Sequence, residues 1–227
     1  MRWIDVDRSR MNMVAQPVQP GVQPETVAGT QLVEPAWLSE RIADMGISWG
    51  TGNSRISGTL WWCMTASALV DPIVEAYATG VAPLDPTLER LRCEMRPDGG
   101  IERIVGAPVA GNDHTAGAML RETLDRVVPV LAQVTGAGAA ALWAIVADAI
   151  GNRAIDAGAP AVAGVLAGQV GQRLPRPRFV DIASRTFVRR ISCCVVFEVP
   201  GCSMCTSCPK RPAAEREHLL AEAARRR

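Results

Sequence analysis

Histidine is scarce in this sequence, which holds His114 and His218 and no other histidine among 227 residues. The chain therefore has too few histidines to favour catalysis by a histidine base or a histidine-rich metal site. A surplus of one charge is lacking too, because 24 Lys and Arg stand against 23 Asp and Glu. The net charge of +1 provides no overall attraction to nucleic acid or to an anionic membrane, so we expect no nucleic-acid partner.

The first residues lack the basic flank and apolar run of a secretory signal, because acidic residues follow Met1 closely. A hydrophobic run that could span a bilayer is also lacking. The uncharged stretch 56–70 is too short, and the stretch 127–147 is interrupted by Pro129 and by glycines. We expect a cytoplasmic protein without a transmembrane segment, and peripheral association with a membrane is left open.

Three parts are predicted along the chain. Residues 1–36 are rich in proline and have no periodic pattern, so we expect a flexible leader, with ordered structure beginning near Trp37. Residues 37–212 are expected to form one globular domain. Residues 213–227 are rich in Ala, Glu and Arg and predict an exposed helical tail.

The domain is predicted to have an α+β fold that is dominated by helices, with a small β-hairpin and a cysteine-rich segment near its C-terminal end. The turn residues Pro97–Gly100 predict a hairpin over 91–105, and β-branched residues predict a strand over 191–199. Helices are predicted at 56–70, at 73–77 after the start signal Asp71-Pro72, behind the caps Asn112 and Asp113, on both sides of Thr135-Gly136, and at 161–170.

Residues 136–141, Gly-Ala-Gly-Ala-Ala-Ala, satisfy the relaxed pattern of a dinucleotide-binding loop. That pattern is informative only between a strand and a helix, with an acidic residue at the end of a second strand. Asp156 lies at the right distance, but the residues before it do not resemble a strand, and Pro129 interrupts the first one. A turn between two helices is the better interpretation.

Cysteine is too infrequent for a disulfide scaffold, with seven in the chain. Cys63 and Cys93 stand alone in apolar segments and are predicted to be small core residues. The other five fall within sixteen consecutive residues: Cys193, Cys194, Cys202, Cys205 and Cys208.

Four of these thiols, on Cys193, Cys194, Cys205 and Cys208, could form a soft metal site. A two-iron cluster is favoured over zinc, because adjacent Cys193 and Cys194 do not form the usual zinc knuckle. A four-iron cluster that uses Cys202 is a further alternative, since Cys202, Cys205 and Cys208 imitate part of a ferredoxin motif. A buried cysteine pair beside an unrelated surface dithiol also remains open.

The cysteine segment resembles the C-terminal signature of the FhuF-type ferric-siderophore reductase family. The resemblance rests on Arg190-Ile191-Ser192-Cys193-Cys194, ten further residues, and Cys205-Thr206-Ser207-Cys208-Pro209. Weaker similarity, to actinobacterial members, involves Trp61-Trp62 with the residues before it, Leu142–Ile145, Asn152-Arg153 and Phe179–Asp181, and extends over 37–212. Cys202 departs from the family pattern.

The resemblance implies a [2Fe–2S] cluster on Cys193, Cys194, Cys205 and Cys208, within a motif at 189–211. It implies one-electron reduction of iron that is chelated by a siderophore, with electrons from a ferredoxin or an NAD(P)H-dependent reductase. An electron carrier or an iron-sensing module without its own substrate site is the alternative function. We further predict a basic rim around the cluster that compensates its negative charge and steers an anionic chelate or donor: Arg189, Arg190, Lys210 and Arg211.

Overall fold

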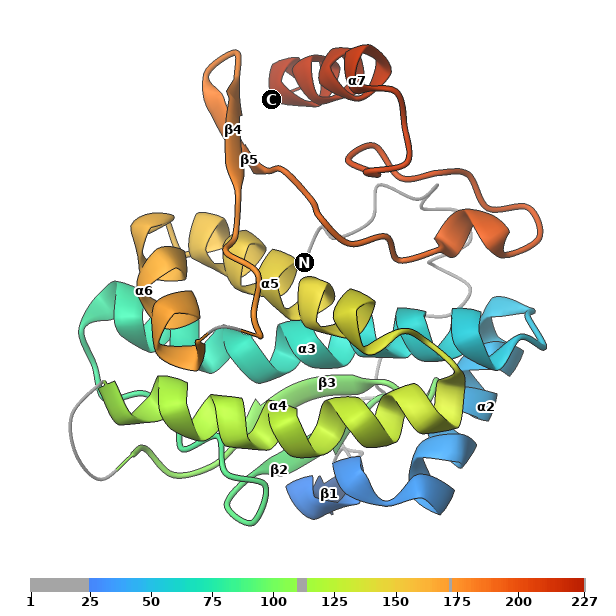
Figure 1. Cartoon of the computed structure of the whole chain (residues 1–227), viewed down its shortest axis with the longest axis vertical. Helices are drawn as coiled ribbons and strands as arrows, with labels where there is room; N and C mark the ends of the chain where they lie inside the picture. The colour runs from blue at the N-terminus through green and yellow to red at the C-terminus, as the bar shows by residue number, and fades with distance from the viewer. Residues whose placement is uncertain (1–24, 110–113, 172, 227) are drawn as a thin grey trace, which may run out of the picture.

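A computed structural model describes residues 25–109, 114–171 and 173–226. The fold is α+β and rich in helix, as predicted (Figure 1). No helix among the described residues is both long and apolar enough to traverse a bilayer. In chain order the elements are β1 (Thr26–Ala28), η1 (Gly29–Val33), α2 (Pro35–Trp49), α3 (Ser54–Thr79), β2 (Arg92–Met95), β3 (Ile101–Val105), α4 (His114–Thr135), α5 (Ala139–Asp156), α6 (Ala161–Val170), β4 (Phe179–Ile182), β5 (Arg185–Val188), η2 (Val196–Glu198) and α7 (Ala213–Arg225).

Helix α3 is the centre of the molecule, because it contacts α2, α4, α5, α6 and strand β3. Asn53 caps its start by accepting hydrogen bonds from the N–H groups of Arg55 and Ile56. Trp61 and Trp62 are fully buried, and the Trp62 Nε1–H donates to the Leu142 carbonyl of α5 at 2.9 Å. These contacts hold α3 and α5 together, and the cysteine segment lies beside this pair.

The two helices predicted at 56–70 and 73–77 are one continuous helix, which is a correction. Pro72 lies inside α3 and removes only one backbone N–H from the ladder. Leu69, Val70, Ile73 and Val74 on both sides of the proline are fully buried. Packing of this apolar surface maintains the helix across a residue that would end an exposed one.

The predicted hairpin is confirmed as β2 and β3, in an antiparallel sheet of order β1-β2-β3. In its turn, the Asp98 carboxylate is buried and accepts hydrogen bonds from the Gly100 N–H and the Arg96 guanidinium. The Trp61 Nε1–H donates to the Gly99 carbonyl at 3.0 Å. The turn is therefore attached to α3, and β3 packs along the same helix.

The expectation that order begins near Trp37 is wrong. Strand β1 pairs with β2, and Leu32 of η1 is fully buried. A Cβ on Gly29 would lie 2.6 Å from the Leu88 carbonyl oxygen, so the chain enters the core where only glycine fits. The predicted leader thus contributes a strand and a core residue.

The glycine-rich residues 136–141 connect α4 to α5, as the helix-to-helix interpretation predicts. Gly136 has a left-handed φ of 72°, which is typical of a residue just past a helix end. Helix α6 occupies the predicted range 161–170. The predicted caps Asn112 and Asp113 of α4 lie outside the described residues.

The C-terminal segments form a layer above the helices, with the β4–β5 hairpin, the cysteine segment and α7 (Figure 1). The strand predicted at 191–199 is wrong: its residues pair with no strand in the part of the chain that the structure describes, and 196–198 form the short helix η2. The β4–β5 hairpin was not predicted. Helix α7 is present where a helical tail is predicted, and it contacts β4 and buries Leu220.

Candidate metal centre

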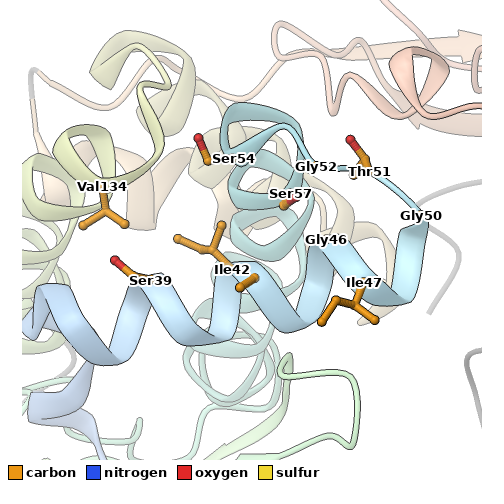
Figure 2. A pocket seen from close by; sticks show the side chains of 11 residues that line it. Ser39, Ile42, Gly46, Ile47, Gly50, Thr51, Gly52, Ser54, Ser57 and Val134 are labelled. Atoms are coloured by element: carbon orange, nitrogen blue, oxygen red, sulfur yellow. The ribbon is translucent and has the colours of Figure 1, made fainter.

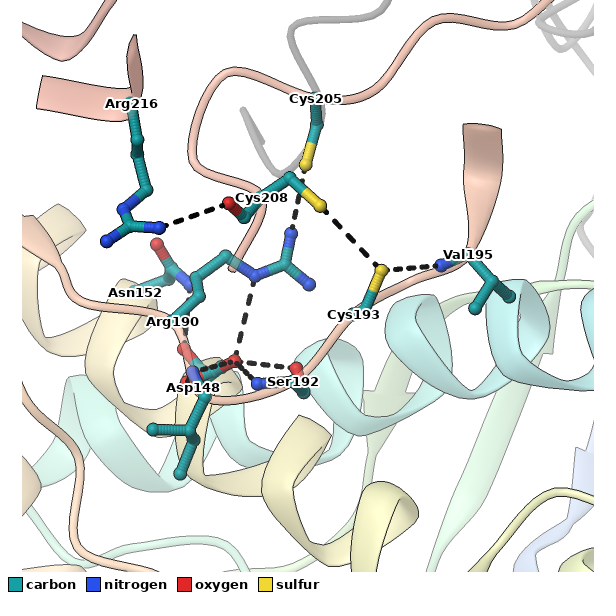
Figure 3. Close-up of polar contacts among 10 residues, drawn as sticks. Asp148, Asn152, Arg190, Ser192, Cys193, Val195, Cys205, Cys208 and Arg216 are labelled. Atoms are coloured by element: carbon teal, nitrogen blue, oxygen red, sulfur yellow. Dashed lines mark hydrogen bonds and ion pairs between the residues drawn. The ribbon is translucent and has the colours of Figure 1, made fainter. Parts of the chain in front are cut away.

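Two segments of the C-terminal layer bring the four cysteines together. Figure 3 shows three of them, Cys193, Cys205 and Cys208. Cys193 and Cys194 follow strand β5, and Cys205 and Cys208 lie in the loop between η2 and α7. The Cys193 and Cys208 Sγ atoms are 3.8 Å apart, and the Cys205 thiol is hydrogen-bonded to Cys194. The structure therefore joins the first segment to the second through two sulfur pairs.

The backbone around Cys193 and Cys194 explains how neighbouring residues face one site. On a strand they would point to opposite sides, but residues 191–195 do not form a strand here, and the chain turns directly after the cysteine pair at Val195, whose φ of 53° is left-handed. The Val195 N–H donates to the Cys193 Sγ at 3.4 Å. In the second segment, the Cys208 N–H donates to the Cys205 carbonyl at 3.1 Å and closes a tight turn.

The sulfur spacing suits thiolate ligands. Two thiolates on one tetrahedral metal lie about 3.8 Å apart when each metal–sulfur bond is about 2.3 Å. A disulfide would require a separation of about 2.05 Å, and the cysteines are free thiols. Among the described residues, no three or more His, Cys, Asp or Glu side chains surround one point as a single metal ion requires. Two pairs of sulfurs suit a binuclear cluster, which has ligands at both ends.

A buried ion pair lies beneath the sulfurs. The Arg190 Nη1–H donates to the Cys205 Sγ at 3.5 Å, and its Nε lies 3.6 Å from an Asp148 carboxylate oxygen on α5. The exposed fractions of these two side chains are 3% and 0%. Asp148 also accepts hydrogen bonds from the Ile191 N–H, the Ser192 N–H and the Ser192 hydroxyl. One carboxylate therefore fixes the start of the cysteine segment and orients the arginine.

Neighbouring groups change the pKa of the Cys194 thiol and of the Arg190 guanidinium. The hydrogen bond from Cys205 and the charge of Arg190, acting against burial, lower the pKa of Cys194 to about 5. Burial lowers the pKa of Arg190, but the nearby Cys194, Cys205, Cys63 and Asp148 outweigh it and raise that pKa overall. A thiolate is thus stabilised at Cys194, whereas burial raises the pKa of Cys193 to about 11 and the hydrogen bond with Cys194 raises the pKa of Cys205.

Comparison with known proteins agrees with this geometry. Residues 190–210 match the family model of the FhuF 2Fe-2S C-terminal domain. The cofactor is a [2Fe–2S] cluster. No curated protein matches the chain. The match covers the cysteine segment alone, so the similarity predicted over 37–212 and the actinobacterial character stay predictions.

The chain's residues fit such a cluster in charge as well as in donor type. Four thiolates and bridging sulfides carry more negative charge than two irons neutralise, and Arg190 provides a buried positive charge beside Cys205. Cys194, Cys205 and Cys208 are buried, whereas Cys193 is partly exposed. The FhuF-type segment thus has a covered side against α5 and an accessible side at Cys193.

The four residues of the predicted basic rim do not share one environment. Arg189 and Lys210 are exposed, and Lys210 lies 5.1 Å from the centre of the Phe197 ring. Arg211 is partly buried and donates to the Cys205 and Met204 carbonyls. Arg190 is buried and points inward to Asp148, which corrects the prediction that it steers a partner, while its charge lies beside Cys205 as charge compensation requires.

The remaining cysteines are placed differently. Cys93 is in β2, where burial raises its pKa to about 12, and it is a core residue as predicted. Cys63 of α3 is also buried in the core, but it interacts electrostatically with Cys194 and Arg190, a proximity that the sequence does not indicate. Cys202 is partly exposed in the loop after η2.

Asp148 was missed in the sequence analysis. A signal was available, because Asp148 directly follows the uncharged stretch 127–147 and continues its apolar helix. An acidic residue within such a helix requires a buried partner. The partner, Arg190, is 42 positions away in the sequence, and only the folded chain joins them.

A pocket of about 630 Å³ lies between α2 and the start of α3 (Figure 2). Its lining is apolar and hydroxyl-bearing, with side chains such as Ile42, Ile47, Ser54 and Ser57. Among residues 25–109, 114–171 and 173–226, no charged residue and no cysteine lines it. An anionic chelate would require a positive charge, so we assign this pocket no part in the metal centre.

Proposed function

We propose that the protein is a ferric-siderophore reductase of the cytoplasm, which uses a [2Fe–2S] cluster on Cys193, Cys194, Cys205 and Cys208. The observation that carries the proposal is the pairing of these sulfurs across two segments within the FhuF-type match. The four thiols would hold the cluster as two pairs, Cys193 with Cys208 and Cys194 with Cys205. In each pair, one thiol comes from each segment.

The reaction transfers one electron. When bound, the cluster accepts an electron from a donor protein and supplies it to the chelated metal. A reduced ferredoxin or an NAD(P)H-dependent reductase loses that electron, and Fe(III) in the siderophore gains it and becomes Fe(II). Siderophore oxygens are hard anionic donors that match Fe(III), whereas Fe(II) prefers softer ligands, so the reduced ion is released.

The chain's own residues position and expose the site. Arg211 holds the Cys205 carbonyl at 2.9 Å, and Arg216 donates to the Cys208 carbonyl at 3.5 Å. Both arginines therefore fix the backbone of the second segment. The partly exposed Cys193 marks the side on which the substrate and the donor would approach.

The charge distribution supports approach of an anion to this side. Residues 171–227 contain twelve Lys and Arg against five Asp and Glu, whereas residues 1–170 contain twelve against eighteen. The near-zero net charge of the chain is therefore the sum of a basic C-terminal part, residues 171–227, and an acidic remainder. Within the C-terminal layer we propose Arg189, Lys210 and Arg211 as the docking residues for an anionic chelate or donor.

A single-turnover experiment tests the function. The protein is reduced anaerobically, freed of reductant and mixed with a ferric trihydroxamate or tricatecholate in the presence of a chelator specific for Fe(II). We expect about one Fe(II) to be trapped per chain as the visible spectrum of the oxidised cluster returns. Iron-free protein is the control.

If the reduced protein remains reduced with every chelate, the reductase proposal is wrong. An electron carrier or iron-sensing module would then account for the same cysteines. Iron and acid-labile sulfide are measured on the same sample. About two of each per chain support the cofactor assignment, and zinc without colour would contradict it.

A further inference from the structure

We propose that Arg190 is a positioning residue that sets the reduction potential of the cysteine centre, and that Asp148 orients it for this task. The inference rests on the proposed function, because it takes the cluster as the group that Arg190 faces. It assigns to these two residues a role beyond holding the chain together.

The first observation is the direction of the guanidinium. The Arg190 Nη1–H reaches the Cys205 Sγ at 3.5 Å, while its Nε lies 3.6 Å from the Asp148 carboxylate (Figure 3). The planar fork of arginine permits both contacts at once, which a lysine ammonium would not reproduce with the same geometry. Arg190 thus presents a hydrogen-bond donor to a ligand sulfur from the covered side of the site.

The second observation is burial. The Arg190 side chain is 3% exposed, so solvent and salt screen its charge little. By contrast, the neighbouring Arg189 is exposed. A reduced cluster carries one more negative charge than an oxidised one, and a buried positive charge favours the reduced state. Hydrogen bonds to ligand sulfurs act in the same direction.

The third observation is the set of contacts that Asp148 makes. Its carboxylate accepts hydrogen bonds from the Ile191 N–H, the Ser192 N–H and the Ser192 hydroxyl, with distances from 2.6 to 3.1 Å. These bonds fix the carboxylate relative to the residues just before Cys193. The Arg190 fork is therefore aligned by the same group that positions the first ligand pair.

Potentiometry of the loaded protein tests the proposal. We compare wild type with Arg190→Gln, Arg190→Lys and the control Arg153→Gln. Arg153 belongs to α5 and is also largely buried, at 12% exposure, but it pairs with Asp71 and Asp156 instead of a cysteine. The measurement needs no siderophore, so it is independent of whether a ferric chelate is reduced.

We expect Arg190→Gln to reduce the equilibrium constant for one-electron reduction at least tenfold, which lowers the midpoint potential by about 59 mV or more. Arg190→Lys keeps the charge but loses the fork, and its potential should fall between those of wild type and Arg190→Gln. Arg153→Gln should change the constant less than twofold. The spectrum and the iron content must match wild type in each loaded variant.

A loaded Arg190→Gln protein with the wild-type potential overturns the proposal and leaves Arg190 a structural residue. If Arg190→Gln does not retain iron, the lysine variant decides. A loaded Arg190→Lys protein with a midpoint potential below that of wild type then supports the proposal, whereas a wild-type potential, or loss of iron from both variants, overturns it. Wild-type protein that contains no iron and sulfide would instead refute the proposed function.

Discussion

The position of each sulfur, rather than its residue type, separates the four cysteines that we propose as ligands from the others. Cys193, Cys194, Cys205 and Cys208 meet across two segments, whereas Cys93 is in the sheet core. We expect serine at any of the four to lower iron from about two per chain to less than one. Iron and sulfide analysis after purification without oxygen measures the effect.

Matched controls come from the other cysteines. Cys202→Ser and Cys63→Ala should keep about two irons per chain, because neither residue belongs to a sulfur pair. About four irons in wild type, lost in Cys202→Ser, would contradict the assignment and favour the ferredoxin-like alternative.

Asp148 is expected to be essential for the stability of the C-terminal layer. Asp148→Asn removes the buried carboxylate charge beside Arg190 and turns an amide N–H₂ toward the Ser192 donors. Breaking a buried pair of this kind costs about 3–5 kcal/mol. Urea unfolding of the iron-free protein measures the loss.

The control for Asp148 is Asp156→Asn at the end of the same helix. Asp156 is 55% exposed and pairs with Arg153, so its loss should change the free energy of unfolding by about 1 kcal/mol or less. Equal effects at the two positions would show that the buried contacts of Asp148 are unimportant.

At the scale of secondary-structure elements, helices α3 and α4 approach closely because Gly58 has no side chain. A Cβ on Gly58 of α3 would lie 2.2 Å from the Thr135 Cγ2 of α4. We expect Gly58→Ala to destabilise the protein by about 1–3 kcal/mol, because the helices would have to separate. Thermal or urea unfolding checks this.

Gly164 of α6 provides the comparison, since a Cβ there would meet no atom within 4 Å. Gly164→Ala should stabilise the protein by about 0.5–1 kcal/mol through its effect on the helix backbone. If both variants were stabilised, the effect of alanine at position 58 would come from the helix backbone and not from the contact between α3 and α4.

On the scale of the whole molecule, the basic C-terminal layer is expected to accelerate association with anionic partners. Arg189→Glu with Lys210→Glu should lower the second-order rate of chelate reduction about tenfold at low ionic strength, without a change in midpoint potential. The difference from wild type should shrink as salt is raised, because the Debye length falls to about 8 Å at 0.15 M. Stopped-flow mixing measures both.

Arg126→Glu is the matched control, because Arg126 is an exposed residue of α4 that pairs with Glu89 on the body. Its rate should equal that of wild type. Rates that do not depend on salt in any variant would contradict steering by the C-terminal layer.

Elements fixed by neighbouring residues were predicted correctly, whereas elements that depend on contacts between distant residues were not. The β2–β3 hairpin and the α4–α5 turn were predicted, since residues within each turn decide its conformation, such as Gly99 and Gly136 with φ of 79° and 72°. The boundary at Pro72 was wrong because buried residues on both sides maintain α3. Order before Trp37 was missed because β1 needs β2 as its partner.

The sequence alone indicated a thiol-rich site near the C-terminal end of this protein. The spacing of Cys193, Cys194, Cys205 and Cys208 is a local property, and the turn at Cys205–Cys208 forms within one short segment. Only the tertiary structure decided which sulfurs pair, that Arg190 points inward, and that Asp148 lies beneath the site. Those outcomes depend on packing of the C-terminal layer against α5, which joins residues over 40 positions apart. No local pattern encodes such a contact, because its free energy exists only when both surfaces are buried together.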